Sequence, residues 1–328
     1  MNFLVTRFSS LGDVIMAGPV FENIKLNYPG SFVYFLTKKT YADVFLQSPF
    51  VDRIIALEDY SPLKLILLLR RLMPDSVFDL HSSARSILTD IFFPGRVSRV
   101  RSLRRGRKKI LRGEKIVIPD VIDRYLDTLG RKDIAVHTKK TGLFLSDEEI
   151  AAGKKILAGL GIPPAAEIIC VAPQSKWLNK EWPHFRSFFE LAARPGRFFL
   201  IAGEDYDGAE KILPESRFYR NFVKNLCGQL DLRMLFTLIK LSGCVISMDS
   251  GAAHAAAALD RPLIVFFGPT TPAFGFAPPS SKILEADVPC RPCHLHGGNV
   301  CERGDRVCLA SISEAQLLRE VEKILKEK

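Results

Sequence analysis

The stretch SMDSGAAH at 247–254 combines residue types that could bind a diphosphate. An apolar strand is predicted to end just before Asp249, and an alanine-rich helix follows at once. Gly251 lets the backbone approach a ligand closely, and the free N–H groups of the first helical turn suit phosphate oxygens. His254, one turn into the helix, could add a donor. Asp249 and Ser250 could equally be an ordinary helix cap, and His254 a core histidine.

A second short motif, FGPTTP at 267–272, follows the next apolar run of the chain. In an open α/β sheet, ligands bind beyond the carboxyl ends of the strands. The two motifs are therefore predicted to meet at one sheet edge and to form one binding site. Their joint occurrence favours a diphosphate site over the ordinary interpretations of each motif alone.

An acid that could do chemistry lies near the start of the chain, in RFSSLGDVIMAGP at 7–19. An apolar run, a short Ser/Gly turn and apolar residues at helical spacing predict a strand, a loop and a helix. This is how a nucleotide-binding α/β unit begins, although the glycine fingerprint of a dinucleotide site is missing. Asp13 is either an acid of a first helical turn, which is the commoner use, or a carboxylate presented for catalysis.

Strand-like and helix-like segments alternate through the chain, which predicts βαβ units and parallel sheets. The first series has predicted strands at 3–6, 31–36, 53–57 and 77–80 and helices at 13–27, 40–47 and 63–73. A capping box, SDEE, starts a helix that ends near the break GIPP at 161–164. The second series has predicted strands at 167–172, 198–202, 244–247 and 262–267 and helices at 182–193, 232–242, 251–259 and 313–328. We predict an α/β protein of two doubly wound, Rossmann-like domains, 1–162 and 163–328, that face a central cleft.

The composition is that of a globular protein, with 328 residues, 47% hydrophobic and 25% charged. No apolar run approaches the ~20 residues needed to span a bilayer, and the N-terminus lacks a signal-peptide pattern. A cytoplasmic location is therefore expected. The net charge of +10 predicts an anionic partner.

Much of the positive charge is concentrated in the run 96–115, RVSRVRSLRRGRKKILRGEK, whose only acid is Glu114. A solvated face, nucleic acid, a phosphorylated glycolipid and an anionic membrane surface are all compatible with such a run. No established nucleic-acid module is present, so no nucleic acid is expected. The run favours an anionic, membrane-associated substrate.

Four cysteines, Cys290, Cys293, Cys301 and Cys308, lie in a cysteine-rich segment at 290–308. Their spacing is compatible with a structural zinc site or an iron–sulfur cluster. Reduced thiols or a disulfide pair are alternatives, because the second pair is separated by six residues rather than two. The remaining three cysteines lie in apolar segments and are expected to be buried.

Four motifs in order, SSLGDV, LNKEWP, DSGAAH and FGPTTP, extend over 9–272. With them the sequence resembles the heptosyltransferase family of bacterial lipopolysaccharide synthesis, glycosyltransferase family 9. The resemblance implies the GT-B fold, with the acceptor bound by the N-terminal domain and the nucleotide sugar by the C-terminal domain, which carries the cysteine-rich segment and a final helix. It also implies inverting transfer of heptose from ADP-heptose, with no metal or other cofactor needed for catalysis.

The resemblance further implies roles for residues that match the family's motifs. Asp13 matches the general base that deprotonates the acceptor hydroxyl. The donor's diphosphate and sugar are expected at Lys180, Asp249, Ser250, Gly251 and His254. The donor's nucleoside is expected at Glu204 and Ser175, and the acceptor at Ser10 and Gly12. Arg85, together with the basic run from Arg96, would suit a phosphorylated acceptor, so Arg85 is also expected to bind it.

The expected acceptor is a phosphorylated, Kdo-bearing lipid, bound at the inner face of the cytoplasmic membrane by an enzyme in peripheral contact with it. Whether the accepting sugar is Kdo or heptose stays open. Two alternatives remain at this point. One is a GT-B glycosyltransferase with another nucleotide-sugar donor, and the other is a non-catalytic protein that binds nucleic acid or an anionic surface.

Overall fold

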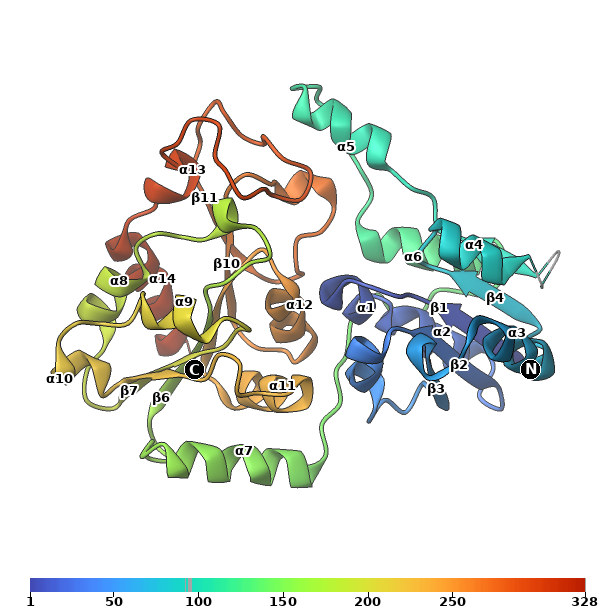
Figure 1. Cartoon of the computed structure of the whole chain (residues 1–328), viewed down its shortest axis with the longest axis horizontal. Coiled ribbons are helices and arrows are strands. Elements are labelled where there is room, and N and C mark those ends of the chain that lie inside the picture. Colours follow the sequence, from blue (N-terminus) through green and yellow to red (C-terminus); the bar gives the residue numbers. More distant parts are fainter. Residues whose placement is uncertain (92, 94–95, 328) are drawn as a thin grey trace. The chain divides into compact units, whose positions relative to one another are not determined.

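The computed structural model describes residues 1–91, 93 and 96–327, which form two compact units (Figure 1). The first unit comprises 1–105 and 119–144, and the second comprises 106–118 and 145–328. Each is a doubly wound α/β unit with a parallel sheet, as predicted. In the part of the chain that the structure describes, no helix is both long and apolar enough to cross a membrane.

The helix α7 (Asp147–Gly159) belongs to the second unit, so the chain divides earlier than at the predicted residue 162. The reason is its packing on α11 (Leu232–Leu241). A Cβ atom at Gly153 would lie only 2.5 Å from the Thr237 methyl carbon, so the two helices approach closely. Arg233 of α11 donates to both carboxylate oxygens of Glu149, at 2.7 and 2.8 Å. The assignment of acceptor and donor binding to the two domains stays a prediction.

The first unit is built on five parallel strands in the order β3-β2-β1-β4-β5. Their bounds are β1 Asn2–Thr6, β2 Phe32–Thr37, β3 Arg53–Ala56, β4 Ser76–Asp79 and β5 Val97–Arg99. The strand order reverses between β1 and β4. The carboxyl ends of these two strands are therefore where a ligand site is expected in this unit.

The helices of the first unit are α1 Leu11–Ile15, α2 Gly18–Asn27, α3 Pro62–Leu72, α4 Ala84–Asp90 and α6 Val121–Gly130, with short 3-10 turns η1 Lys39–Phe45 and η2 Leu57–Asp59. The helix predicted at 13–27 is thus two helices. Proline at position 19 explains the break, because its ring would clash with the carbonyl of Ile15 in a continuous helix. Pro19 instead lies in the first turn of α2, where the missing N–H is tolerated.

Different elements cover the two faces of the first sheet. On one face, apolar side chains of β1, β2 and β4 pack with Leu65 and Leu69 of α3. On the other face, Phe21 of α2 contacts Phe35 of β2 and Phe45 of η1, with ring centroids 5.2 and 5.0 Å apart. The helices α3 and α2 therefore lie on opposite sides of the sheet.

Two buried carboxylates share one guanidinium at the carboxyl end of β4. Asp79 and Asp90 are 0% and 5% exposed, and Arg99 of β5 donates to both. Asp79 also accepts the N–H groups of His81 and Ser82, each at 2.9 Å, which fixes the loop after β4. Burial raises the pKa of Asp90 to about 7, although the bond from Arg99 opposes the rise.

The second unit is built on six parallel strands in the order β11-β10-β9-β6-β7-β8. Their bounds are β6 Glu167–Ala172, β7 Arg197–Ile201, β8 Val223–Asn225, β9 Cys244–Met248, β10 Leu263–Phe267 and β11 Lys282–Glu285. Its other helices are α8 Phe185–Ala192, α9 Tyr206–Glu210, α10 Arg217–Arg220, α12 Gly251–Ala258, α13 Val307–Ala310 and α14 Glu314–Lys326, with the 3-10 turns η3 Leu178–Lys180 and η4 Pro272–Phe274. The helix α5 (Arg104–Leu111) belongs to the second unit from residue 106 onward. The strand order reverses between β6 and β9. Lys328, the last residue of the predicted final helix, lies outside the described residues.

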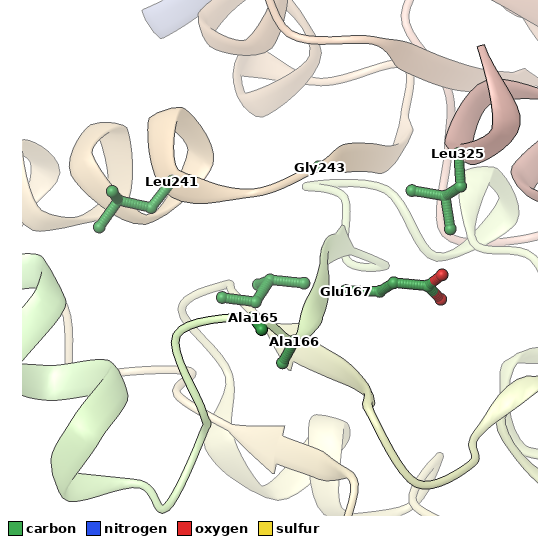
Figure 2. A pocket seen from close by; sticks show the side chains of 7 residues that line it. Ala165, Ala166, Glu167, Leu241, Gly243 and Leu325 are labelled. Carbon is green, nitrogen blue, oxygen red and sulfur yellow. The ribbon is translucent and has the colours of Figure 1, made fainter. Parts of the chain in front are cut away.

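A cavity of about 220 Å³ lies at the amino ends of β6 and β9 (Figure 2). Its walls include Glu167 at the start of β6, Gly243 before β9, Leu241 of α11 and Leu325 of α14. This edge is opposite to the strand ends at which ligands of α/β sheets bind, so the cavity is not part of the site described below.

We expect Asp90 to make the stability of the protein depend on pH. Its folded pKa of about 7 exceeds the ordinary value of 3.8, so between these values the folded state binds a proton that the unfolded chain releases. The stabilisation is full below pH ~4 and is lost as the pH rises through ~7. Asp90→Asn removes this titration, so its free energy of unfolding should fall less steeply across this window, by up to about 1.4 kcal/mol per pH unit.

The measurement is denaturant unfolding of wild type and variant at a series of pH values. Asp75→Asn, at an exposed aspartate just before β4, is the matched control and should keep the wild-type slope. Equal slopes for wild type and Asp90→Asn would show that Asp90 does not titrate in this way.

Candidate functional site

Asp13 lies in the first turn of α1, just beyond the carboxyl end of β1. The Nη2 atom of Arg7 is 2.8 Å from its Oδ2 atom. The backbone N–H and the hydroxyl of Ser10 donate to the same oxygen at 3.2 and 2.8 Å. The Tyr125 hydroxyl of α6 lies 3.4 Å from Oδ1. Asp13 is therefore both a capping residue of α1 and the centre of a polar cluster, so the two sequence interpretations are compatible.

Arg7 connects the loop of Asp13 to the neighbouring strand. Its Nη1 atom donates to the Leu80 carbonyl, just after β4, at 2.6 Å. The link spans β1 and β4, where the strand order reverses. Burial opposes the charge of Arg7, but the charge and the hydrogen bond of Asp13 favour it, and the pKa of Arg7 is raised above its usual value. A guanidinium this close favours the carboxylate form of Asp13, which is the form that a general base needs.

Two further groups of this cluster are neutral near neutral pH. Burial raises the pKa of Tyr125, so its hydroxyl keeps its proton and can donate to Asp13. Burial, followed by the charge of Arg7, lowers the pKa of His81, so its imidazole is uncharged. Asp13 thus meets a charged guanidinium on one side and a neutral phenol on the other.

The residues predicted to bind the acceptor lie around the same strand ends. Ser10 is exposed beside Asp13, whereas Gly12 is buried within α1. Arg85, in the first turn of α4, is exposed and lies over the Phe8 ring at 6.0 Å. The structure brings these residues to one edge of the first sheet, and their role in acceptor binding stays a prediction.

In the second unit, Lys180 and Asp249 form an ion pair. The Lys180 Nζ atom lies 2.7 Å from Asp249 Oδ2 and also donates to the Asp249 carbonyl. The two side chains are 9% and 16% exposed. The Thr270 hydroxyl donates to the same Oδ2 atom at 2.8 Å. Lys180 follows β6 and Asp249 follows β9, so the pair spans the reversal of strand order in this sheet.

The helix predicted to follow Asp249 is present as α12. The strand β9 ends at Met248 and α12 begins at Gly251, with Ser250 as its extended N-cap residue. The hydroxyls of Ser250 and Ser247 are 3.1 Å apart. His254 is buried, one turn into the helix. The N–H groups of this first turn start next to Asp249, so a bound anion there would meet both the helix N-terminus and the Lys180 charge.

The loop after β10 lies beside Asp249, so the two motifs meet at one sheet edge, as predicted. Arg291 donates to the carbonyls of Gly268 and Thr270, at 2.9 and 3.1 Å. Two backbone N–H groups of the cysteine-rich segment donate to the Pro269 carbonyl, at 3.0 and 3.1 Å. These bonds hold the loop so that Thr270 reaches Asp249.

Ser175 and Glu204 lie beyond the carboxyl ends of two neighbouring strands, β6 and β7. Gln174 connects their loops, because its side chain donates to the carbonyl of Asp205 and accepts the N–H of that residue at 3.1 Å. The Ser175 N–H donates to Glu181 Oε1 at 3.1 Å. The Glu204 side chain is exposed, which suits contact with ribose hydroxyls, and that role stays a prediction.

The structural metal or cluster predicted at the four cysteines is not supported. Within the residues that the structure describes, no group of three or more His, Cys, Asp or Glu side chains is arranged to hold a metal ion. Cys308 of α13 is packed into the apolar core, whereas Cys293 is exposed, so the thiols lie at different depths. All four of these cysteines are free, and burial raises the pKa of Cys308 above its usual value.

The cysteine-rich segment instead positions Lys180. Asn179 donates its N–H to the Gly298 carbonyl at 3.0 Å, and its side chain accepts the Gly298 N–H at 2.8 Å. Gly297 has φ of +104°, and a Cβ atom there would lie 2.8 Å from both the Lys180 Cδ atom and the Trp177 Cβ atom. Only glycine allows this close approach of the segment to the lysine.

Residues 116–296, more than half of the chain, match the family described as Glycosyltransferase family 9 (heptosyltransferase). The chain belongs to this family. It is 25% identical, over 348 aligned positions, to lipopolysaccharide heptosyltransferase 2 of Salmonella typhimurium, and the match covers 100% of this chain and 99% of the relative.

Solved structures of heptosyltransferases have the same fold as this chain. The ADP-heptose LPS heptosyltransferase II of Escherichia coli has a TM-score of 0.79 at 20% identity, with 100% of this chain and 99% of that chain covered. An Escherichia coli heptosyltransferase determined with ADP-2-deoxy-2-fluoro heptose has a TM-score of 0.65 at 18% identity, with 98% and 99% covered. The predicted GT-B fold class is confirmed, and the family 9 protein is a glycosyltransferase.

Several residues of the two clusters in this family 9 protein were not singled out from the sequence. They are Arg7, Tyr125, Asn179, Thr270, Arg291 and Gly297. Thr270 lies within a motif that was recognised and could have been chosen as a polar residue at a strand end. The contacts of Tyr125 and Arg291 link segments far apart in sequence, and no spacing rule reports such contacts.

Gly297→Ala is expected to weaken diphosphate binding by this family 9 protein. The new methyl group would push the Lys180 side chain away from Asp249, and a displaced charge at such a site lowers affinity about tenfold or more. Calorimetric titration with pyrophosphate measures the change. Gly304→Ala is the matched control, because Gly304 has φ of +80° in the same segment but no atom near its Cβ position. Equal losses in both variants would attribute the effect to backbone strain rather than to Lys180.

Proposed function

We propose that this family 9 glycosyltransferase transfers a heptose residue from ADP-heptose to the inner core of lipopolysaccharide, with inversion at the anomeric carbon. The observation that carries the proposal is the Lys180–Asp249 pair beside the start of α12. It places a positive charge and a helix N-terminus together, as a diphosphate leaving group requires. The relatives are named as heptosyltransferases, and one was determined with an ADP-heptose analogue, which supports this donor.

The second unit is proposed to bind the donor. The Lys180 ammonium and the first-turn N–H groups of α12 stabilise the charge that develops on ADP as the bond to the sugar breaks. Ser250, Gly251 and His254 contribute to the same diphosphate and sugar site, and Ser175 and Glu204 bind the nucleoside. Asp249 holds Lys180 in place before the donor arrives. These groups belong to the chain itself, so the proposed mechanism uses no metal.

The first unit is proposed to bind the acceptor and to supply the base. Asp13 takes the proton of the acceptor hydroxyl as its oxygen attacks the anomeric carbon, and the bonding electron pair of the old bond leaves with ADP. Arg7 keeps Asp13 ionised and oriented. Ser10, Gly12 and Arg85 contact the acceptor, a phosphorylated Kdo-bearing lipid at the inner face of the cytoplasmic membrane.

Asp13→Asn is expected to lower the transfer rate by at least about a hundredfold, because the amide cannot accept the proton. ADP affinity should stay unchanged, because Asp13 is assigned to the acceptor. A coupled assay of ADP release with a lipopolysaccharide acceptor measures the rate, and calorimetry measures ADP binding. Asp59→Asn, at an exposed aspartate paired with Lys39 in the same unit, is the matched control. Near-normal turnover of Asp13→Asn would remove Asp13 from the mechanism.

Lys180→Ala is expected to weaken ADP binding about tenfold or more, because a charge-assisted contact to phosphate is lost. Lys176→Ala removes the same charge at an exposed position four residues earlier and should bind ADP as the wild type does. Titration of the wild type with ADP, UDP and GDP tests the base in parallel. Unchanged ADP affinity in Lys180→Ala contradicts the diphosphate assignment, and preference for UDP or GDP contradicts the donor.

A further inference from the structure

The helix α4 has its polar side toward the sheet and its apolar side toward solvent. Ser86 is fully buried and donates to Asp79 at 3.0 Å, and Asp90 is buried against Arg99. Leu88 and Ile91, in contrast, are 61% and 63% exposed. A surface helix of a globular protein normally has the opposite arrangement. An inverted helix of this kind indicates a surface that is covered by something apolar.

The helix α3 lies on the same face of the first sheet and also has exposed apolar residues. Leu65 and Leu69 of α3 pack with Val77 of β4 on that face. Asp79, which accepts a hydrogen bond from Ser86 of α4, lies two positions after Val77, so its side chain is on the same face of the sheet. Figure 1 shows α3 and α4 beside β4, which connects them in the chain. The exposed apolar residues of the two helices and their ends, here called the α3–α4 surface, are 40–70% exposed: Leu63, Leu67, Met73, Ile87, Leu88 and Ile91.

The exposed charges within α3 and α4 are positive. Lys64, Arg71 and Arg85 are exposed on the two helices. The only acid within either helix is Asp90, which is buried and paired with Arg99. A second copy docked symmetrically on this surface would bring like charges together. Exposed apolar side chains with a fringe of lysine and arginine fit instead the interface of an anionic bilayer, which takes up apolar groups and attracts cations.

The α3–α4 surface starts at the acceptor side of the first unit. The helix α4 begins four residues after Leu80, whose carbonyl is bonded to Arg7, the partner of Asp13. We propose that the α3–α4 surface docks onto the anionic inner leaflet, so that a lipid-linked acceptor can reach Asp13 without leaving the membrane. This proposal rests on the proposed function for the identity of the acceptor, but the docking itself is independent of the donor.

The test is co-sedimentation of the full chain with vesicles of phosphatidylglycerol and phosphatidylcholine, compared with phosphatidylcholine alone. The wild type is expected to bind the anionic vesicles, and more weakly at high salt. The double variant Leu67→Glu, Leu88→Glu should bind at least about tenfold more weakly, because two apolar contacts become charged. The matched control is Leu26→Glu, Leu46→Glu, at leucines that are 51% and 56% exposed on elements of the opposite sheet face, and it should bind nearly as the wild type does.

A second measurement does not depend on a loss of binding. Leu88→Trp should show a blue shift of tryptophan fluorescence when anionic vesicles are added, whereas Leu26→Trp should not. Calorimetric binding of ADP reports separately on the donor site. A protein that binds vesicles through this surface but does not bind ADP would refute the proposed function and leave the docking proposal standing.

Three outcomes would overturn the docking proposal. The first is that the wild type does not bind anionic vesicles, or that the double variant Leu67→Glu, Leu88→Glu binds them as strongly as the wild type does. The second is that this variant changes the oligomeric state in sedimentation equilibrium, which would make the surface an interface between copies of the chain. The third is that Arg104→Glu, Lys108→Glu in α5 abolishes binding while the α3–α4 variant keeps it, which would assign binding to the basic run.

Discussion

The reversal of strand order in each parallel sheet is the constraint on which both candidate sites depend. At the reversal, the loops after two neighbouring strands diverge and leave their carboxyl ends open to a ligand. In the first sheet the reversal lies between β1 and β4, and in the second between β6 and β9. Asp13 follows β1 and is paired with Arg7 of its own loop, which also bonds to the loop after β4. Asp249 follows β9 and is paired with Lys180 from the loop after β6.

The two ion pairs suit different chemical tasks. The planar Arg7 guanidinium contacts Asp13 and a backbone carbonyl together, so it orients the carboxylate and connects two strand ends. Lys180 is a compact charge on a flexible stem, held by Asp249, and it can turn to a phosphate oxygen without a change of backbone. An arginine therefore suits the proposed role of Asp13 as a base that stays in place, and a lysine suits the proposed role of Lys180 as a charge that exchanges one partner for another.

The sequence predicts the elements and the strand-end residues, but not the tertiary contacts that fix them. Hydrophobic periodicity and the 247–254 motif correctly predict β9 followed by α12, because both depend on neighbours in sequence. The cysteine spacing suggested a metal, whereas the segment holds Lys180 through Asn179 and Gly297 by backbone contacts. Hydrogen bonds between backbone atoms require no particular side chains, so the sequence does not reveal them. The glycine that allows the close approach is visible in the sequence, but glycines are common in any loop.

The inverted polarity of α4 follows from the demands of the site next to it. The buried Asp79 accepts bonds from the loop after β4, from Ser86 and from Arg99, so a helix placed over it must present polar side chains inward. If the outer side of this helix met only water, charged residues would be favoured there. Its apolar residues are explained when something apolar covers that side. The polar network at the carboxyl end of β4 and the apolar residues proposed to meet the membrane therefore lie on two sides of one short helix. In the proposed docking, this single helix therefore connects the membrane surface to the loop that is bonded to Arg7.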